Sequence, residues 1–122
     1  MEPLFTVERL AHMQMNVSDI EKSVEFYRIF DPEAGEKGGR VRVELGEQTR
    51  LILVHEPNLK KGPGALNHFA VVLEGAKDVE PVLALMRAHG AEPYDGPREN
   101  NAGRMQFRVN DPDGNEIEVQ LK

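Results

Sequence analysis

The 122-residue sequence consists of two similar halves, and this internal repeat restricts the possible folds more than any other feature. Residues 12–17 (HMQMNV) alternate polar and apolar side chains as a strand does, and residues 18–30 follow with the pattern of a helix. The same order returns in residues 68–73 (HFAVVL) and 78–90, so His68 stands where His12 stands in the first half. We therefore expect each half to begin with a strand and a helix.

Both predicted helices have recognisable ends. Ser18 and Glu21 form a capping box that starts the first helix, whose apolar face comprises Ile20, Val24, Tyr27 and Phe30. The second helix has Asp78 as its predicted N-cap and ends at Gly90, and its apolar stripe comprises Val79, Val82, Leu83 and Met86.

The segments after each helix also match. Residues 39–45 correspond to 103–109, and residues 52–55 correspond to 117–120, so that Leu53 aligns with Glu118. Each half is then a strand, a helix and a run of hairpin-linked strands.

Turn residues mark the boundaries of these strands. Residues 111–115 (DPDGN) predict a tight turn between the last two strands, and residues 57–64 predict a polar linker between the halves. A third strand in the second half is poorly marked, with Ala91 to Pro93 as the best candidate. The pattern predicts an α+β fold in one domain, and a ferredoxin-like α+β domain without any site is one alternative.

Composition limits the chemistry. The chain has no cysteine, so any bound metal must be held by His, Asp or Glu. Its net charge of −6 argues against a general nucleic-acid or anionic-membrane binder, which would need a basic surface. The N-terminal segment MEPLFTVERL lacks the basic and apolar regions of a signal peptide, and no apolar run approaches a membrane span. We expect a cytoplasmic protein.

Strand alternation predicts one polar face in the sheet. The apolar residues of each strand should pack on the helices, and the other residues should form the free face. This face should carry both histidines that begin the paired strands. It comprises His12, Gln14, Asn16, Arg40, Arg42, Glu44, Leu53, His55, His68, Ala70, Val72, Arg104, Gln106, Arg108, Glu116, Glu118 and Gln120. If the halves join edge to edge and curl into a cup, His12, His68 and Glu118 meet at its centre, where two imidazoles and a carboxylate suit a divalent cation.

Three segments resemble the vicinal oxygen chelate superfamily, also called the glyoxalase/bleomycin-resistance/dioxygenase family: residues 12–27 (HMQMNVSDIEKSVEFY), residues 67–69 and residues 111–119 (DPDGNEIEV). The resemblance covers the chain from about Arg9 to its end. It implies two βαβββ modules, at about 8–57 and 66–122. These modules form a cup-shaped mixed or antiparallel sheet with helices on the outer face. It also implies a homodimer as the expected assembly, with modules exchanged between chains as one alternative.

The resemblance also implies a metal site. Family members place ligands at the start of the first strand of each module and on the last strand, which here are His12, His68 and Glu118. The expected ion is a divalent metal, Zn, Mn, Ni, Co or Fe(II), and the choice among these stays open. Leu53, aligned with Glu118, leaves the position of a fourth ligand apolar, which argues against a glyoxalase I assignment.

Further residues are interpreted as substrate-binding. The loop before Arg104 borders the substrate in the family, and a guanidinium there can bind a carboxylate, phosphonate or enediolate. Tyr94 is interpreted as a pocket wall, Gln14 faces the cup, and Arg108 lies on the same face. The role of His55 stays open, and a place at the rim is favoured over a ligand role.

Two functions follow as alternatives. The first is a divalent-metal-dependent enzyme that acts on a small oxygen-chelating metabolite or antibiotic as a lyase, isomerase, thiol transferase or dioxygenase, with Glu118 as ligand and proton shuttle. The second is a metal-free binding protein of the bleomycin-resistance kind. Aromatic residues make up 6% of the chain, which argues against an aromatic-lined drug cage.

Overall fold

The repeat folds as two modules of the same topology in a computed structural model, which describes residues 3–62 and 64–122. The first module contains a four-stranded sheet in the order β1-β4-β3-β2 (sheet 1), and the second contains one in the order β5-β8-β7-β6 (sheet 2). The strands next to β1 and β5 run parallel to them, and the other pairs are antiparallel. The elements in chain order are β1 (His12–Val17), α1 (Ile20–Tyr27), β2 (Gly35–Lys37), β3 (Arg40–Glu44), β4 (Arg50–His55), β5 (His68–Leu73), α2 (Val79–Ala88), β6 (Tyr94–Glu99), β7 (Met105–Asn110) and β8 (Glu116–Leu121).

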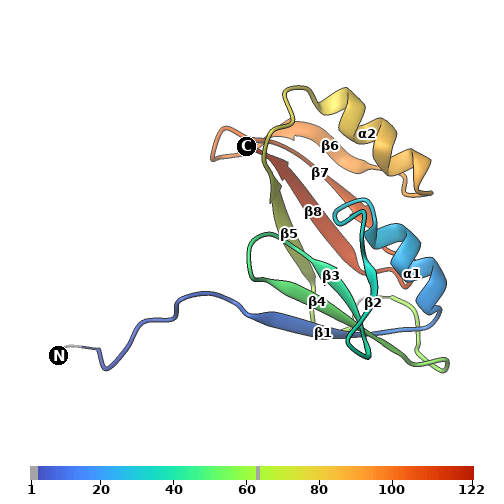
Figure 1. Cartoon of the computed structure of the whole chain (residues 1–122). Coiled ribbons are helices and arrows are strands. Elements are labelled where there is room, and N and C mark those ends of the chain that lie inside the picture. Colours follow the sequence, from blue (N-terminus) through green and yellow to red (C-terminus); the bar gives the residue numbers. More distant parts are fainter. Residues whose placement is uncertain (1–2, 63) are drawn as a thin grey trace.

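The predicted α+β fold of two βαβββ modules is confirmed. Figure 1 shows the two sheets one above the other, with both helices on the same side of the molecule. Within the described chain the sheets stay separate and do not close into a cup, so β1 and β5 each form an open sheet edge. No helix in the described part of the chain is long and apolar enough to cross a membrane.

The first helix begins differently from the prediction. Asp19 is its N-cap, and the Asp19 carboxylate accepts a hydrogen bond from the backbone N–H of Lys22 at 3.1 Å. The Ser18 hydroxyl is unavailable for the expected capping box because it donates to the Asp113 carboxylate of the second module. The helix ends at Tyr27, and its buried residues are Ser23, Phe26 and Tyr27, so the buried stripe is shifted from the predicted one.

The second helix follows its prediction more closely. Val82, Leu83 and Met86 are buried as expected, and Asp78 has the extended backbone of an N-cap but makes no side-chain capping bond. Gly90 follows the last turn with a φ of +79°, a conformation that glycine adopts without strain.

The third strand of the second module is β6, and the prediction of a strand at Ala91 to Pro93 is wrong. The N–H of Ala91 bonds to the carbonyl of Met86 at 3.0 Å, so this segment completes the end of α2. The predicted turn at 111–115 is confirmed, and the Gly114 N–H bonds to the Asp111 carbonyl at 3.0 Å. The predicted linker 57–64 joins the modules, and its Pro63 lies outside the described residues.

Alternation places the apolar side of both sheets against the helices, largely as predicted. The largest buried side chains include Tyr27, Phe107, Leu51, Met86 and Ile117. Met105 is an exception, because it is 38% exposed at the start of β7. Burial of each large apolar side chain contributes about 1.5–3 kcal/mol to folding.

The prediction for β4 is wrong by one residue. β1 and β4 pair in parallel with Met15 opposite Leu53 and Val17 opposite His55, so Leu53 and His55 lie on the helix side of sheet 1. Leu53 is 3% exposed there. Arg50 and Ile52 occupy the free face instead, because a shift of one residue moves every side chain of a strand to the other face.

Candidate functional site

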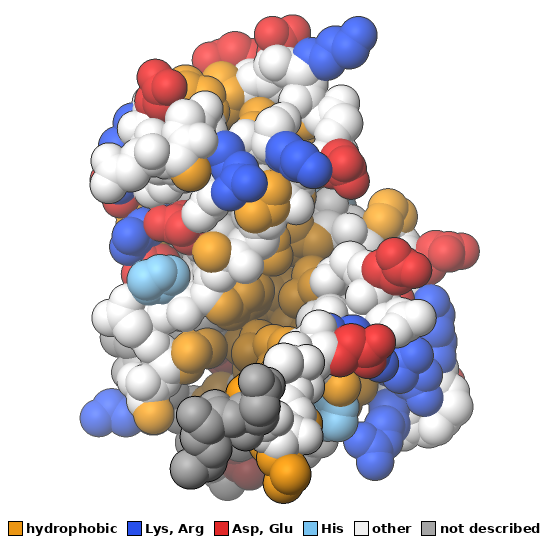
Figure 2. Space-filling model, turned by 90° about the vertical axis from the view of Figure 1, so that its left-hand side faces the viewer, with side chains coloured by type: hydrophobic (Ala, Val, Ile, Leu, Met, Phe, Trp, Pro, Cys, Tyr) orange, Lys and Arg blue, Asp and Glu red, His pale blue; other side chains and the backbone are white. Residues whose placement is uncertain are grey.

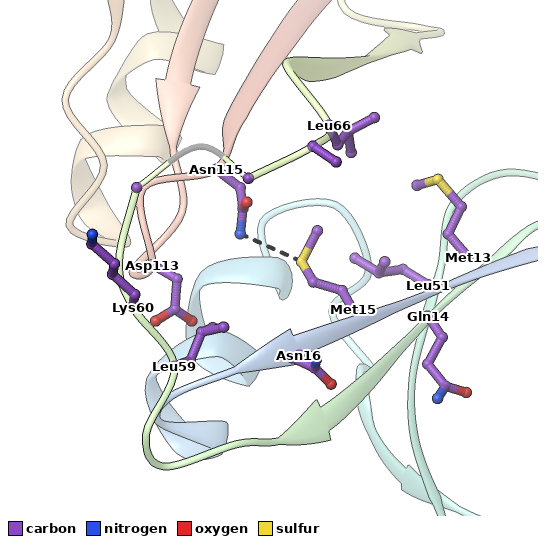
Figure 3. Close-up of a pocket in the computed structure, with 13 residues that line it drawn as sticks. Met13, Gln14, Met15, Asn16, Leu51, Leu59, Lys60, Leu66, Asp113 and Asn115 are labelled. Atoms are coloured by element: carbon purple, nitrogen blue, oxygen red, sulfur yellow. Dashed lines mark hydrogen bonds between the residues drawn. The ribbon is translucent and has the colours of Figure 1, made fainter.

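Each sheet has a face that points away from its helix and corresponds to the free face predicted from the sequence. From here on we call this face, opposite to the helices, the outer face. Figure 3 shows this alternation in β1, where Met13 and Met15 point into the space between the modules and Gln14 and Asn16 point to the other side. The register places His68 beside Glu116 and Ala70 beside Glu118, so His68 and Glu118 lie diagonally on the outer face of sheet 2. That face carries most of the residues that the sequence singled out.

The Glu118 carboxylate is held in a fixed orientation. The Gln106 side-chain amide donates to its Oε1 at 3.2 Å, and the Gln120 amide donates to its Oε2 at 2.8 Å. Arg108 Nη2 lies 3.5 Å from the same Oε1. The Glu118 side chain is only 14% exposed, so neighbouring groups rather than water fix its orientation.

Glu116 is fixed by Tyr94 and Arg108. The Tyr94 hydroxyl donates to Glu116 Oε1 at 2.8 Å, and Arg108 Nη1 donates to the same oxygen at 3.0 Å. These hydrogen bonds favour the ionised carboxylate and lower the pKa of Glu116, while burial and the bond to Glu116 raise the pKa of Tyr94 to about 12. Glu116 is therefore an ordered part of this face.

Arg108 is the centre of an ion-pair network. Its guanidinium lies within 3.5 Å of carboxylate oxygens of Asp95, Glu116 and Glu118, and Arg98 shares Asp95. The hydrogen bond with Glu116 raises the pKa of Arg108 further, so it stays charged. In this network three carboxylates share two guanidiniums, and the nearby Arg104, whose Nη1 lies 3.4 Å from the Gln120 side-chain oxygen, adds a third positive charge to the face. The charged groups of this face therefore balance.

Two residues of this face have side chains of the kind that bind divalent metals. His68 Nδ1 lies 2.7 Å from the Asn67 side-chain oxygen, and a neutral imidazole that donates this bond keeps the lone pair of Nε2 for a metal. The Glu118 carboxylate retains lone pairs beyond the amide bonds that it accepts. His68 and Glu118 thus supply one nitrogen and one carboxylate oxygen from adjacent strands, which suits Zn and its neighbours.

His12 and Gln14 lie elsewhere. Both belong to β1 on the outer face of sheet 1, and His12 is exposed beside Arg50, its partner in the strand register. Among the described residues no three potential ligands come together, so one chain does not assemble His12, His68 and Glu118. The two halves of the predicted ligand set lie on different sheets.

The remaining predicted residue, Arg104, lies just before β7, where its Nη1 is 3.4 Å from the Gln120 side-chain oxygen. Sequence reasoning did not identify Gln106, Gln120 and Asp95 as parts of the site. Alternation already placed both glutamines on the same face as Glu118, and this was the available signal. Asp95 has no comparable signal, because its φ of +53° and the bulge in β6 set its position.

The repeat alignment also needs a correction. Because His12 pairs with Arg50 and His68 pairs with Glu116, the counterpart of Glu118 in the first module is Ile52 rather than Leu53. Ile52 is also apolar, so the inference that a fourth carboxylate is missing from this position still holds.

An apolar groove lies between the two modules. Figure 2 shows it as a hollow lined by hydrophobic side chains near the middle of the molecule. It has a volume of about 280 Å³, and its apolar lining includes Leu10, Met13, Phe30, Leu45, Phe69, Val71 and Leu73. The groove follows the helix side of β1 and the edge of β5, where Ala70 and Val72 also line it.

Comparison with known protein families agrees with the family resemblance noted in the sequence. The family model described as glyoxalase/bleomycin resistance protein/dioxygenase superfamily matches residues 9–119. No curated protein sequence matches the chain.

Several solved structures have the same fold. An integron cassette protein from V. cholerae is 23% identical with a TM-score of 0.70, over 97% of this chain and 98% of that one. An antibiotic binding protein from a Streptomyces species is 26% identical with a TM-score of 0.65, over 96% and 98%. A glyoxalase/dioxygenase from Nostoc punctiforme is 16% identical with a TM-score of 0.72, over 100% and 98%.

Proposed function

The chain belongs to the glyoxalase/bleomycin resistance protein/dioxygenase superfamily, and from this premise we propose that it is a divalent-metal-dependent enzyme. His68 and Glu118 of one chain and His12 of a second chain would hold the ion. The observation that supports this most is the orientation of Glu118 by Gln106 and Gln120 on the face that carries His68. When bound, the ion would polarise an oxygen of a small chelating substrate, as a lyase, isomerase, thiol transferase or dioxygenase requires.

The chain's own residues would prepare this site. Gln106 and Gln120 orient the Glu118 carboxylate, and Asn67 orients the His68 ring. Tyr94 and Arg108 hold Glu116 ionised and in a fixed position beside them. Glu118 would act as ligand and as proton shuttle, and Arg104 at the edge of the face would contact the substrate.

A homodimer with exchanged modules would complete the ligand set. The separation of His12 from His68 and Glu118 within one chain, together with the open edges of β1 and β5, supports this assembly. Two copies related by a twofold axis would form two equivalent sites.

Metal content tests the proposal directly. After reconstitution with Zn, Mn, Ni, Co or Fe(II), elemental analysis should find about one ion per chain in the wild type, as expected for a preformed site. His68→Ala should lose most of this metal, and the matched control His89→Ala should keep it, because His89 lies against Glu25 of α1. Less than about 0.1 ion per chain in the wild type would defeat the proposal.

Mixing of subunits tests the assembly. His12→Ala and Glu118→Ala proteins should each bind little metal alone. After unfolding and refolding together in equal amounts, exchanged dimers should regain about a quarter of the wild-type content, because half of the dimers carry one intact site. No recovery would show that the ligands do not come from two chains.

A metal-free small-molecule binding protein is the second candidate. The likeness to an antibiotic binding protein and the apolar groove between the modules favour it. Chelator-treated protein should then be stabilised against heat by an aromatic antibiotic from a test panel, and His68→Ala should be stabilised equally. Stabilisation that requires both the metal and His68 would support the enzyme instead.

A further inference from the structure

The outer face of sheet 1 carries a cluster of basic residues. A depression of about 210 Å³ on this face is lined by His12, Arg40, Arg42, Arg50 and Ile52. Figure 2 shows Lys and Arg side chains gathered in the lower right part of the molecule. Because the chain as a whole carries a charge of −6, this clustering does not follow from its composition.

The strand register relates this cluster to the site on sheet 2. Arg50 stands beside His12 as Glu116 stands beside His68, so a guanidinium replaces a carboxylate at the equivalent place. The electrostatic character of the position is therefore reversed between the two modules.

The same comparison applies to the next strand. Arg108 stands opposite Glu118 across β7 and β8, and Arg42 stands opposite Ile52 across β3 and β4. Ile52 is the counterpart of Glu118, so Arg42 is the counterpart of Arg108. In sheet 2 the Arg108 guanidinium is surrounded by carboxylates. In sheet 1 the residue opposite Arg42 is Ile52, which has no charge.

Arg42 and Arg40 have no anionic partner among the described residues. Neither guanidinium lies within 4 Å of a carboxylate there, and Arg42 Nε is buried without a hydrogen-bond acceptor. Arg50, by contrast, has an anionic partner, because its Nε lies 3.1 Å from Glu44 Oε1. A buried guanidinium N–H without an acceptor is costly, and an anionic oxygen would satisfy it.

We propose that the outer face of sheet 1 binds the anionic group of a substrate, a carboxylate, phosphate or phosphonate, through Arg42 and Arg40. Arg guanidiniums bind such oxygens through paired hydrogen bonds. The depression has room for a group of this size and leaves the rest of the ligand outside. The proposal rests on the proposed function in one respect, that His12 in the same depression would place this group next to the metal.

Phosphate binding to metal-free protein tests this site without the metal. Chelator-treated protein is titrated with inorganic phosphate at constant ionic strength and followed by backbone amide NMR shifts. Saturable shifts are expected in residues of β3 and β4. Arg42→Gln should weaken phosphate binding about tenfold, as expected for loss of a charge-assisted pair. The control Arg87→Gln removes an equal charge from α2, where Arg87 pairs with Glu92, and should leave binding unchanged.

Two further measurements identify the kind of anion and provide a second variant. Acetate in place of phosphate distinguishes a site for carboxylates in general, which binds both, from one for phosphate or phosphonate. Arg40→Gln removes an exposed side chain and keeps the test valid if Arg42→Gln fails to fold.

Equal phosphate responses in Arg42→Gln and Arg87→Gln would overturn the proposal. It would also be overturned if phosphate did not bind and Arg42→Gln instead weakened dimerisation, because the cluster would then pair with acidic residues of a second copy. The metal measurement stays independent, since wild-type protein that binds phosphate but no metal would defeat the proposed enzyme and leave this site standing.

Discussion

The contact between the two modules depends on a buried hydrogen bond that a single substitution removes. The Tyr27 hydroxyl donates to Asp111 Oδ2 at 2.7 Å, and both residues are at most 4% exposed. Tyr27→Phe keeps the ring and leaves the buried carboxylate oxygen with only the Asn115 side-chain amide, at 2.9 Å. Loss of a hydrogen bond to a charged group costs about 1.5–3 kcal/mol. We therefore expect the free energy of unfolding to fall by about 2 kcal/mol.

Urea denaturation measures this change. The midpoint should fall while the slope stays the same, because both proteins expose similar surface on unfolding. Tyr94→Phe is the matched control. Its hydroxyl donates to Asn110 and Glu116 at a residue that is 38% exposed, so water can replace these bonds. We expect it to lose less than about 1 kcal/mol.

The dependence of the unfolding free energy on alkaline pH provides a second check. Burial, and then the neighbouring Asp111, raise the pKa of Tyr27 well above its ordinary value, so the folded state keeps this proton more strongly than the unfolded state. The resulting stability is complete below about pH 10 and is lost as the pH rises above it. This part of the alkaline loss should be absent from Tyr27→Phe. A change in unfolding free energy below about 0.5 kcal/mol would refute the assignment of the hydrogen bond as a major link between the modules.

Three further results are expected. Asp19→Ala should lower stability by about 1 kcal/mol in thermal unfolding, whereas Asp78→Ala should change it little, because only Asp19 makes a side-chain capping bond. Gly96→Ala should destabilise the protein by at least about 1–3 kcal/mol in urea, since φ is +145° and a Cβ would lie 2.4 Å from the Gln106 carbonyl oxygen; unchanged stability would contradict this geometry. The pKa of Glu116 is lowered in the folded state, so its contribution is present above its unfolded pKa and is lost as the pH falls. The free energy of unfolding of Glu116→Gln should therefore fall less than that of the wild type as the pH is lowered. An equal fall in both proteins would exclude this role.

The repeat and the alternation of side chains determined the modules and much of the site. Local patterns are sufficient for this, because the period of a strand decides which residues share a face. His68 and Glu118 could thus be placed on one face, although β5 and β8 lie far apart in the sequence. The lack of cysteine also restricted any metal to nitrogen and oxygen ligands before the fold was known.

The register of β4 was not determined by the sequence. Residues 50–55 contain a continuous apolar run, LILV, which fits either face, so the repeat alignment alone selected Leu53 instead of Ile52. Pairing with β1 and β3 decides the register, because a shift of one residue would bury Arg50 and expose Leu53. This correction added Arg50 to the face that already carried His12, Arg40 and Arg42.

The pair of modules, their polar faces and the residue types on these faces can be predicted from the sequence. The way in which the modules meet is seen only in the folded chain. Tyr27 and Ser18 donate hydrogen bonds to the two buried carboxylates of the 111–115 turn, and in the described residues of the folded chain His12 and His68 do not belong to one group of ligands. The physical reason is that hydrogen bonds between groups about 90 residues apart depend on the whole packed core, and no local period records them.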